Sequence, residues 1–247
     1  MNSSGYPEVA PPGYRPPNPL VKVVTPYVTY TLMGVTIVIF LLQMATEALL
    51  GYDLPAILGM KINELIAQGQ VWRLITPVFL HGSVVHIGFN MYALFVMGPS
   101  LERAYGHGRF SLLYFLSAYA GNVFSFLFLP APSLGASTAI FGLIGAELVL
   151  LYRNKEYIVN ARGMLNQTIV IAVINFAIGF SSGMIDNWGH LGGLLGGATF
   201  AWFAGPLLSF DIASNSVVDA HTRRDEISAT AVVFLSFTVA AILGFLP

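Results

Sequence analysis

Two residue types that together perform acyl-transfer chemistry lie in glycine-rich runs of this sequence. Ser137 follows Gly135 in the run Gly-Ala-Ser-Thr, and His190 lies in the run Trp-Gly-His-Leu-Gly-Gly. A serine hydroxyl becomes a nucleophile when a base lies within hydrogen-bonding reach. Small residues around both groups allow two helices to approach closely. The two runs therefore predict a serine–histidine pair between neighbouring helices.

Two further polar residues, His86 and Asn90, lie four positions apart and so share one face of a predicted helix. Attack by a serine on a carbonyl creates an oxyanion, which needs hydrogen-bond donors already in place. The side chains of His86 and Asn90 and the backbone N–H of Ser137 are candidate donors. The alternative for each polar residue here is a structural role, in which it packs or hydrogen-bonds between helices.

The composition excludes a water-soluble globule. Of the 247 residues, 55% are hydrophobic and only 9% are charged, whereas about 25% are charged in an ordinary soluble domain. The chain has no cysteine, which excludes disulfides, thiolate metal sites and cysteine nucleophiles. A net charge of -1 gives no indication of a nucleic-acid partner. We expect an integral membrane protein with no metal and no cofactor.

Seven segments approach the length of about 20 apolar residues that a bilayer requires. They are 27–49, 82–100, 110–130, 136–152, 166–182, 187–208 and 228–246. The fourth and the fifth are short. The segments predict an all-α, polytopic membrane bundle with a six-helix core and a seventh, C-terminal span. We divide the chain into a disordered cytoplasmic tail (1–25), the core (26–208), and a cytoplasmic linker with the seventh helix (209–247).

The charges of the connecting segments give the expected orientation. With the N-terminus in the cytoplasm, nine of the 11 Lys and Arg residues lie on the inner side, and only Lys61 and Arg73 lie outside. Such a bias follows the positive-inside rule and places the C-terminus outside. Ser137 and His190 then enter their segments from the outer face and reach a similar, shallow depth. The expected location is a bacterial cytoplasmic membrane.

Small residues recur at four-residue spacing on the fourth and sixth segments. Gly142 and Ala146 share a face of the fourth segment, and Gly193, Gly197 and Ala201 share a face of the sixth. Such faces let two backbones touch, which would bring the Ser137 hydroxyl within reach of a His190 nitrogen. The link at 51–80 is long and mixed in polarity, and it predicts one or two interfacial helices that end at Trp72 and Arg73.

The order of these motifs resembles that of the rhomboid intramembrane serine proteases over residues 60–200. The motifs that carry the resemblance are Trp72-Arg73, His81 with His86 and Asn90, Glu102-Arg103 followed by Gly106, Gly135-Ala136-Ser137, and Gly189-His190 with Gly193 and Gly197.

The resemblance implies a role for each of these residues. Ser137 is the nucleophile and His190 the general base of a dyad that has no third acid, and His86 and Asn90 line the oxyanion site. Trp72 and Arg73 stabilise the first loop, and Glu102-Arg103 ties helix ends. The substrates would be transmembrane segments of single-span proteins, which enter laterally from the lipid bilayer near the fifth helix.

One position departs from the family motif, because Thr138 stands where the family has glycine after the serine. We expect an ordinary helical residue there, which tolerates threonine. A second oddity is Glu147, about ten residues and roughly 15 Å deeper than Ser137. We expect it to be a structural charge with Arg153 or a polar residue of another helix as its partner.

Other readings fit the sequence less well. No His-Glu-x-x-His motif of a zinc protease is present, and no pair of carboxylates lies on adjacent predicted spans. The remaining alternative is a catalytically weak rhomboid-like protein that binds membrane helices without hydrolysis. Such relatives commonly lack the serine or the histidine, and this chain keeps Ser137, His190, His86 and Asn90.

Overall fold

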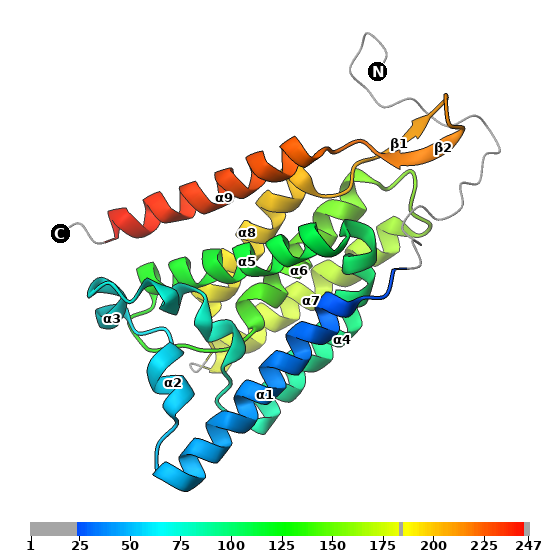
Figure 1. Cartoon of the computed structure of the whole chain (residues 1–247). Coiled ribbons are helices and arrows are strands. Elements are labelled where there is room, and N and C mark those ends of the chain that lie inside the picture. Colours follow the sequence, from blue (N-terminus) through cyan, green and yellow to red (C-terminus); the bar gives the residue numbers. More distant parts are fainter. Residues whose placement is uncertain (1–23, 183–184, 245–247) are drawn as a thin grey trace.

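The computed structural model describes residues 24–182 and 185–244. The predicted disordered tail therefore falls almost entirely outside the described residues. All seven predicted apolar segments are helices, and together they form a helical bundle (Figure 1). Their bounds are α1 (Tyr27–Leu50), α4 (Val84–Tyr105), α5 (His107–Phe128), α6 (Ser137–Arg153), α7 (Ala161–Ser182), α8 (Asn187–Ala204) and α9 (Arg223–Leu243).

Five helices of the described ranges are long and apolar enough to cross a membrane, namely α1, α4, α5, α7 and α9. The exceptions, α6 and α8, have 17 and 18 residues. At about 1.5 Å per residue, α6 is roughly 25 Å long, which is less than the bilayer's apolar thickness of about 30 Å. One end of α6 must therefore lie below a membrane face and be covered by protein.

Several predicted bounds differ from those of the structure by a few residues, and two of them have a clear local cause. α7 begins at Ala161 rather than at 166, so the fifth segment is not short. It starts directly after Asn160, which has a φ of 57° and so lies outside helical geometry. α8 ends at Ala204 rather than at 208. The reason is Pro206, since a proline disfavours helical geometry in the residue before it, and Gly205 is extended.

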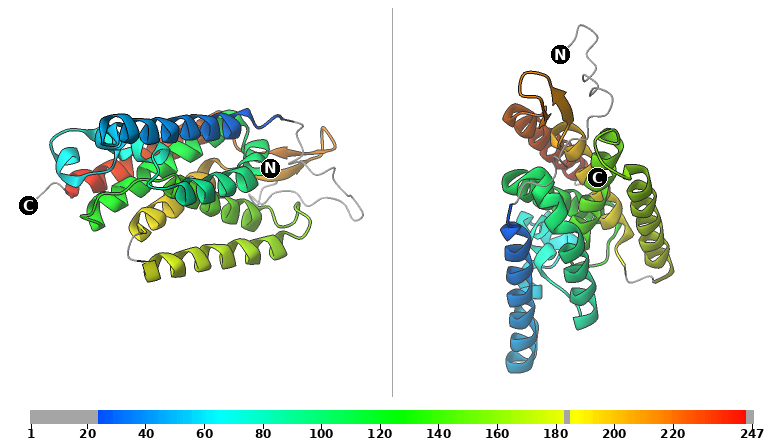
Figure 2. Two further views of the ribbon diagram at one scale, coloured as in Figure 1. Left: turned by 90° about the horizontal axis from the view of Figure 1, so that it is seen from below. Right: turned by 90° about the vertical axis from the view of Figure 1, so that its right-hand side faces the viewer.

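The helices α5, α6 and α8 form the centre of the bundle. In the apolar window of α5, 72% of the residues are buried, against 11% in that of α7. Helix α7 runs along one side of the molecule, apart from most of the other helices (Figure 2). The bundle therefore has a tightly packed centre and one loosely attached wall.

The link between α1 and α4 folds into the short helices α2 (Leu54–Gly59) and α3 (Asn63–Ala67) and the 3-10 turns η1 (Val71–Leu74) and η2 (Thr76–Phe79). The buried Arg73 guanidinium donates hydrogen bonds to the carbonyl oxygens of Met60 (2.6 Å) and Ile57 (2.7 Å). The Trp72 indole N–H donates to the Leu58 oxygen at 3.1 Å. These bonds fold the link back on itself.

The stretch after α8 is not a simple linker. It forms a two-stranded antiparallel hairpin, β1 (Leu208–Asp211) with β2 (Ser216–Asp219), before α9 begins. Arg109, at the start of α5, pairs with Asp219 (2.6 Å) and with Glu226 of α9 (3.3 Å). The hairpin and the first turn of α9 are thereby fixed to the core.

Candidate active site

Ser137 is the first residue of α6, and a constrained glycine delivers the chain to it. Gly135 has a φ of +136°, a conformation that side chains disfavour. Its N–H donates to the Pro77 oxygen at 2.9 Å. A Cβ at this position would lie 2.8 Å from His86 Nε2 and 3.6 Å from Ser137 Oγ. The absence of a side chain at Gly135 therefore makes room for His86 beside Ser137.

His190 lies in the first turn of α8 and is 6% exposed. Its ring stacks on Phe141, with centroids 4.1 Å apart and planes inclined by 12°. Phe141 follows Ser137 by four residues, so both side chains share one face of α6. The stacking therefore holds the imidazole on the face of α6 that carries Ser137, about one turn along the helix.

Glycines allow α8 to touch α6 backbone to backbone. A Cβ at Gly193 would lie 2.0 Å from the Thr138 carbonyl oxygen, and one at Gly197 would lie 2.1 Å from the Gly142 carbonyl oxygen. Real side-chain atoms essentially never come this close. The small-residue faces of the fourth and sixth segments are thus in contact over two turns.

Thr138 is an ordinary residue of the first turn of α6. It is not among the described non-glycine residues with positive φ, which are Asn160 and Asn215. The side chain is 5% exposed and fills the junction of three helices. A Cβ at Gly121 of α5 would lie 2.6 Å from Thr138 Cβ, and one at Gly189 of α8 would lie 3.1 Å from its methyl group. The residue therefore has a packing role.

Ser137 and His190 do not form a hydrogen bond with each other in the described part of the chain. The contact between α6 and α8 brings them to the same junction without closing the pair. His190 Nδ1 is buried and has no partner among the described residues. Catalytic hydrogen bonds are often longer in a free enzyme than with substrate bound. The two groups are therefore a pair without a direct hydrogen bond among the described residues.

The two candidate oxyanion donors lie on α4, on the other side of Gly135. Asn90 is buried, and its Nδ2 has no hydrogen-bond acceptor among the described residues. His86 is half-buried, and its ring meets that of His81 edge-on at 4.9 Å. An amide without an acceptor costs free energy when buried. A developing negative charge beside Ser137 would supply that acceptor.

The sequence analysis missed a set of residues that hold the entrance to α6 and α8. The Asp186 carboxylate caps α8 by accepting the Gly189 N–H at 2.7 Å, and it also accepts a short hydrogen bond from Ser125 of α5. Gln43 of α1 bonds both the N–H (3.0 Å) and the carbonyl (3.3 Å) of His81. The Asp186 cap has a sequence signal, since Asp is a preferred N-cap residue directly before a helix.

Lys61 is fully buried and fixes the loop that leads into α6. Its ammonium donates to the carbonyl oxygens of Leu129 (2.5 Å) and Ala131 (2.8 Å). Burial lowers the pKa of Lys61 to about 8, against an opposing effect of Asp186. The Lys61 ammonium thus satisfies carbonyl groups of the segment that follows α5.

The Glu102-Arg103 motif lies at the far end of α4 from Ser137. The Glu102 carboxylate accepts bonds from the Val28 N–H (2.9 Å), the Thr29 N–H (2.8 Å) and the Thr29 hydroxyl (2.6 Å), and it pairs with His107 at 2.5 Å. It therefore ties the start of α1 to the turn between α4 and α5. The Arg103 side chain forms no hydrogen bond or ion pair to another described residue.

The sequence has known relatives along most of its length. A sequence model of the Rhomboid domain matches residues 68–207. Rhomboid protease GluP of Bacillus subtilis is 42% identical over 172 residues, which is 70% of this chain and 34% of that protein. RHOMBOID-like protein 9, chloroplastic, of Arabidopsis thaliana is 36% identical over 193 residues, 76% of this chain and 44% of that protein. The chain thus spans less than half the length of either relative.

Proposed function

The chain belongs to the rhomboid family, and on that premise we propose that it is an intramembrane serine endopeptidase with a Ser137–His190 dyad. The observation that carries the proposal is the stacking of the His190 ring on Phe141 at 4.1 Å, on the same face of α6 as Ser137. A base held on this face lies on the same side of α6 as the hydroxyl that it would deprotonate. The buried His190 Nδ1 has no carboxylate partner among the described residues, which is compatible with a dyad.

The proposed reaction is acyl transfer to water. Ser137 Oγ attacks the scissile carbonyl carbon while His190 takes the hydroxyl proton. The imidazolium then gives this proton to the leaving amine, and the acyl group remains on Ser137 as an ester. His190 next accepts a proton from water as that water attacks the ester. The acid product leaves, and the serine regains its proton.

The unpaired groups near Ser137 support an oxyanion site. The His86 ring of α4 lies beside Gly135, Asn90 follows it by one helical turn with an unpaired buried amide, and the Ser137 backbone N–H begins α6. Donors that are already oriented toward a developing oxyanion need no reorganisation during the reaction. We propose that these three groups stabilise the tetrahedral intermediate.

We propose transmembrane segments of single-span proteins as the substrates. Helix α7 is exposed over most of its length, and it contributes Phe176, which meets Phe141 edge-on at 4.9 Å beside His190. A substrate helix arriving from the bilayer would pass this loosely packed wall. It would unwind near the cut, because a helical peptide bond hides its carbonyl from attack.

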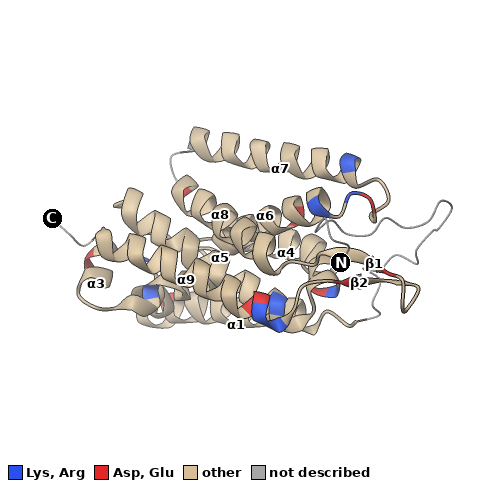
Figure 3. Ribbon diagram, turned by 90° about the horizontal axis from the view of Figure 1, so that it is seen from above, with Lys and Arg blue, Asp and Glu red and all other residues tan. Residues whose placement is uncertain are grey.

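The proposed orientation places the N-terminus in the cytoplasm and the active site near the outer face of a bacterial membrane. Most Lys and Arg residues gather at the end of the bundle that carries β1 and β2 (Figure 3). In this orientation we propose that the core (26–208) and the seventh helix are embedded in the same membrane. Reaction of a cysteine placed at Val159 with an impermeant reagent from the outer side of intact cells would contradict it.

Activity-based labelling tests the dyad. A fluorophosphonate should label the purified wild-type protein, and labelling and cleavage should both be abolished in Ser137→Ala and in His190→Ala. Ser181→Ala is the matched control, because among the described residues this exposed serine hydroxyl bonds only the Ile178 oxygen of its own helix. Absence of labelling in folded wild-type protein would contradict the protease and favour a helix-binding protein without hydrolysis.

A further inference from the structure

Glu147 is an acidic group within the membrane-embedded bundle that the proposed mechanism does not use. Its carboxylate accepts a bond from the Thr168 hydroxyl of α7 at 3.2 Å. That hydroxyl has a single proton and lies nearer to the Met164 oxygen, at 3.0 Å. Of the two partners suggested by the sequence, the polar residue of another helix is present as Thr168, whereas Arg153 bonds the Trp202 carbonyl and lies over the Trp202 ring. Glu147 therefore retains acceptor capacity that the described residues do not use.

The carboxylate lines a pocket of about 150 Å³ between α4, α6 and α7. Ser100, Gln167 and Thr168 add polar groups to its wall, and Val96 and Ile171 stand on its α4 and α7 sides. The pocket therefore has room for a side chain of a neighbouring helix.

The pocket and the proposed nucleophile lie on the same helix at a fixed spacing. Glu147 follows Ser137 by ten residues, which is about 15 Å along α6. A substrate helix lying along the gap between α4 and α7 passes both points. Two or three unwound residues near the cut cover about 3.3 Å each, and the helical residues beyond them cover about 1.5 Å each. The pocket would therefore face a residue about six to eight positions beyond the scissile bond.

We propose that Glu147 recognises a hydrogen-bond-donating side chain on the substrate's transmembrane helix, about six to eight residues beyond the cleaved bond. The inference rests on the proposed protease function and adds a substrate class to it. Asparagine, serine, threonine and lysine would be favoured at that position, and aspartate and glutamate disfavoured. In hydrocarbon no water competes for the carboxylate, so one donor is enough to discriminate between helices.

Binding of designed helices to the intact chain tests the proposal without requiring turnover. The protein carries Ser137→Ala and a fluorophore on Val159→Cys, a residue that is 90% exposed, and is reconstituted in phosphatidylcholine and phosphatidylglycerol vesicles. The probes are labelled leucine–alanine spans with Leu, Asn, Lys or Asp at the guest position. Energy transfer should report about threefold to fifteenfold tighter binding of the Asn helix than of the Leu helix.

Variants of the pocket separate recognition from folding. Glu147→Leu should bring the Asn-to-Leu binding ratio close to one. Glu147→Gln should keep the preference for Asn and lose the preference for Lys, because the amide remains an acceptor without the charge. Asn175→Leu is the matched control, since this exposed α7 residue bonds only its own helix, through the Ile171 oxygen. It should keep the full ratio.

The possible failures are distinguishable. Equal binding of the Leu and Asn helices, or a ratio that survives Glu147→Leu, would overturn the recognition proposal. If the preference is found but protein with Ser137 intact cleaves none of the helices, recognition stands and the protease proposal fails. If that protein cleaves every helix at one rate and binding is equally indifferent, the protease proposal stands and recognition fails.

Discussion

Two helices flank α6, and they contact it in different ways. α8 meets it through backbone atoms, at glycines where a single added carbon would come within 2.0–2.1 Å of a carbonyl oxygen. α7 meets it through side chains, such as Phe176 on Phe141, and most of α7 is exposed. The proposed dyad spans the tight contact, whereas the substrate would arrive at the loose one. The comparison suggests a rigid contact between α6 and α8 beside a wall that can move.

The largest effect should come from adding one carbon to the tight contact. Gly193→Ala places a methyl group against the Thr138 carbonyl, and overpacking of this kind costs about 3 kcal/mol. We expect a clearly lowered melting temperature in detergent and loss of nearly all activity. Gly34→Ala is the control, because nothing lies within 4 Å of its added carbon. Wild-type stability in Gly193→Ala would show that the contact is not tight.

The loose side can be tested by fastening it. The chain has no native cysteine, and Val96 and Ile171 face the same pocket from α4 and α7. Cross-linking Val96→Cys to Ile171→Cys with a short thiol-specific reagent should lower cleavage about fivefold or more if the wall must open. Reduction of a reducible cross-linker should restore it. Undiminished cleavage by fully cross-linked protein would show that substrates enter elsewhere.

A smaller effect is expected at Thr138, where α5, α6 and α8 meet. Thr138→Gly removes a packed side chain and should lower stability by about 1–2 kcal/mol, with a matching loss of activity. Thr138→Val keeps the shape and removes a buried hydroxyl that has no partner among the described residues, so it should be neutral or stabilising. Thermal melts of Thr138→Gly and Thr138→Val distinguish the contribution of the side chain's shape from that of its hydroxyl group. Equal losses in both variants would contradict the packing role.

A different kind of effect is the pH dependence that Lys61 contributes at the entrance to α6. Burial lowers its pKa from 10.5 to about 8. At a pH between these two values the folded protein has a neutral Lys61 and the unfolded chain a protonated one, so unfolding takes up a proton. The free energy of unfolding should therefore rise as the pH is raised from about 8 toward 10.5. Lys61→Met should lack this contribution when both proteins are melted across that range. Identical pH profiles would show that the folded protein does not perturb this lysine.

The sequence predicted the helices well, because long apolar segments and their charged connections reflect the bilayer directly. The small-residue spacing also indicated which helices touch. The ends were harder to predict, since they depend on local backbone features such as Pro206 after α8 and the positive φ of Asn160 before α7.

The hairpin was missed for a related reason. Its strands have only four residues each, and Leu208 and Phe210 are buried against a core whose position no local pattern reveals. The Leu208 N–H donates to the Asn154 side chain at 2.7 Å, a contact between residues far apart in the chain. The sequence does contain one turn signal, Asn215. It has a φ of 48°, a left-handed conformation that asparagine tolerates in turns.

Among the candidate site residues, the sequence indicated which polar groups share a helix face but not what supports them. Gln43 lies on α1 and bonds His81 across a separation of 38 residues, a contact that spacing cannot reveal. The contact between the His190 ring and Phe141 could not be predicted either. In the sequence, Phe141 is one apolar residue of a span among many, and its role follows only from the position of α8 beside α6.

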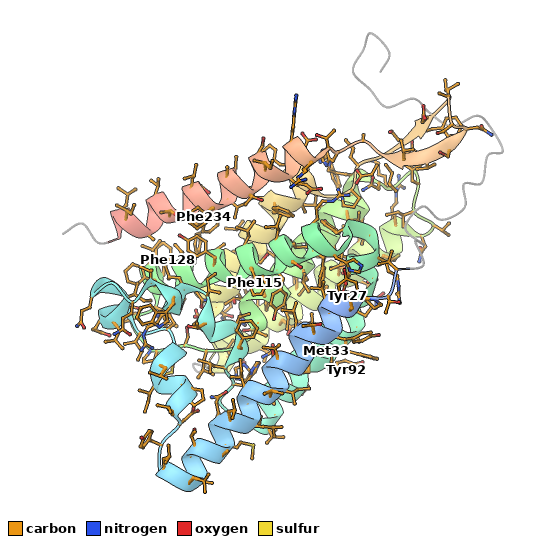
Figure 4. The ribbon with its side chains drawn as sticks, in the orientation of Figure 1. Tyr27, Met33, Tyr92, Phe115, Phe128 and Phe234 are labelled. Atoms are coloured by element: carbon orange, nitrogen blue, oxygen red, sulfur yellow. The ribbon has the colours of Figure 1, made fainter. Side chains whose placement is uncertain are left out.

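The turn between α4 and α5 has a consequence for how the chain is assembled during synthesis. Glu102, just before this turn, holds the start of α1, and Arg109, just after it, holds the start of α9. The sticks of Figure 4 show Tyr27 of α1 beside this corner. The contact of Glu102 with α1 can form once α4 follows α1, whereas the partners of Arg109 are synthesised more than 100 residues after Arg109 itself. One corner of the protein thus joins two spans, α1 and α9, that are made far apart in time.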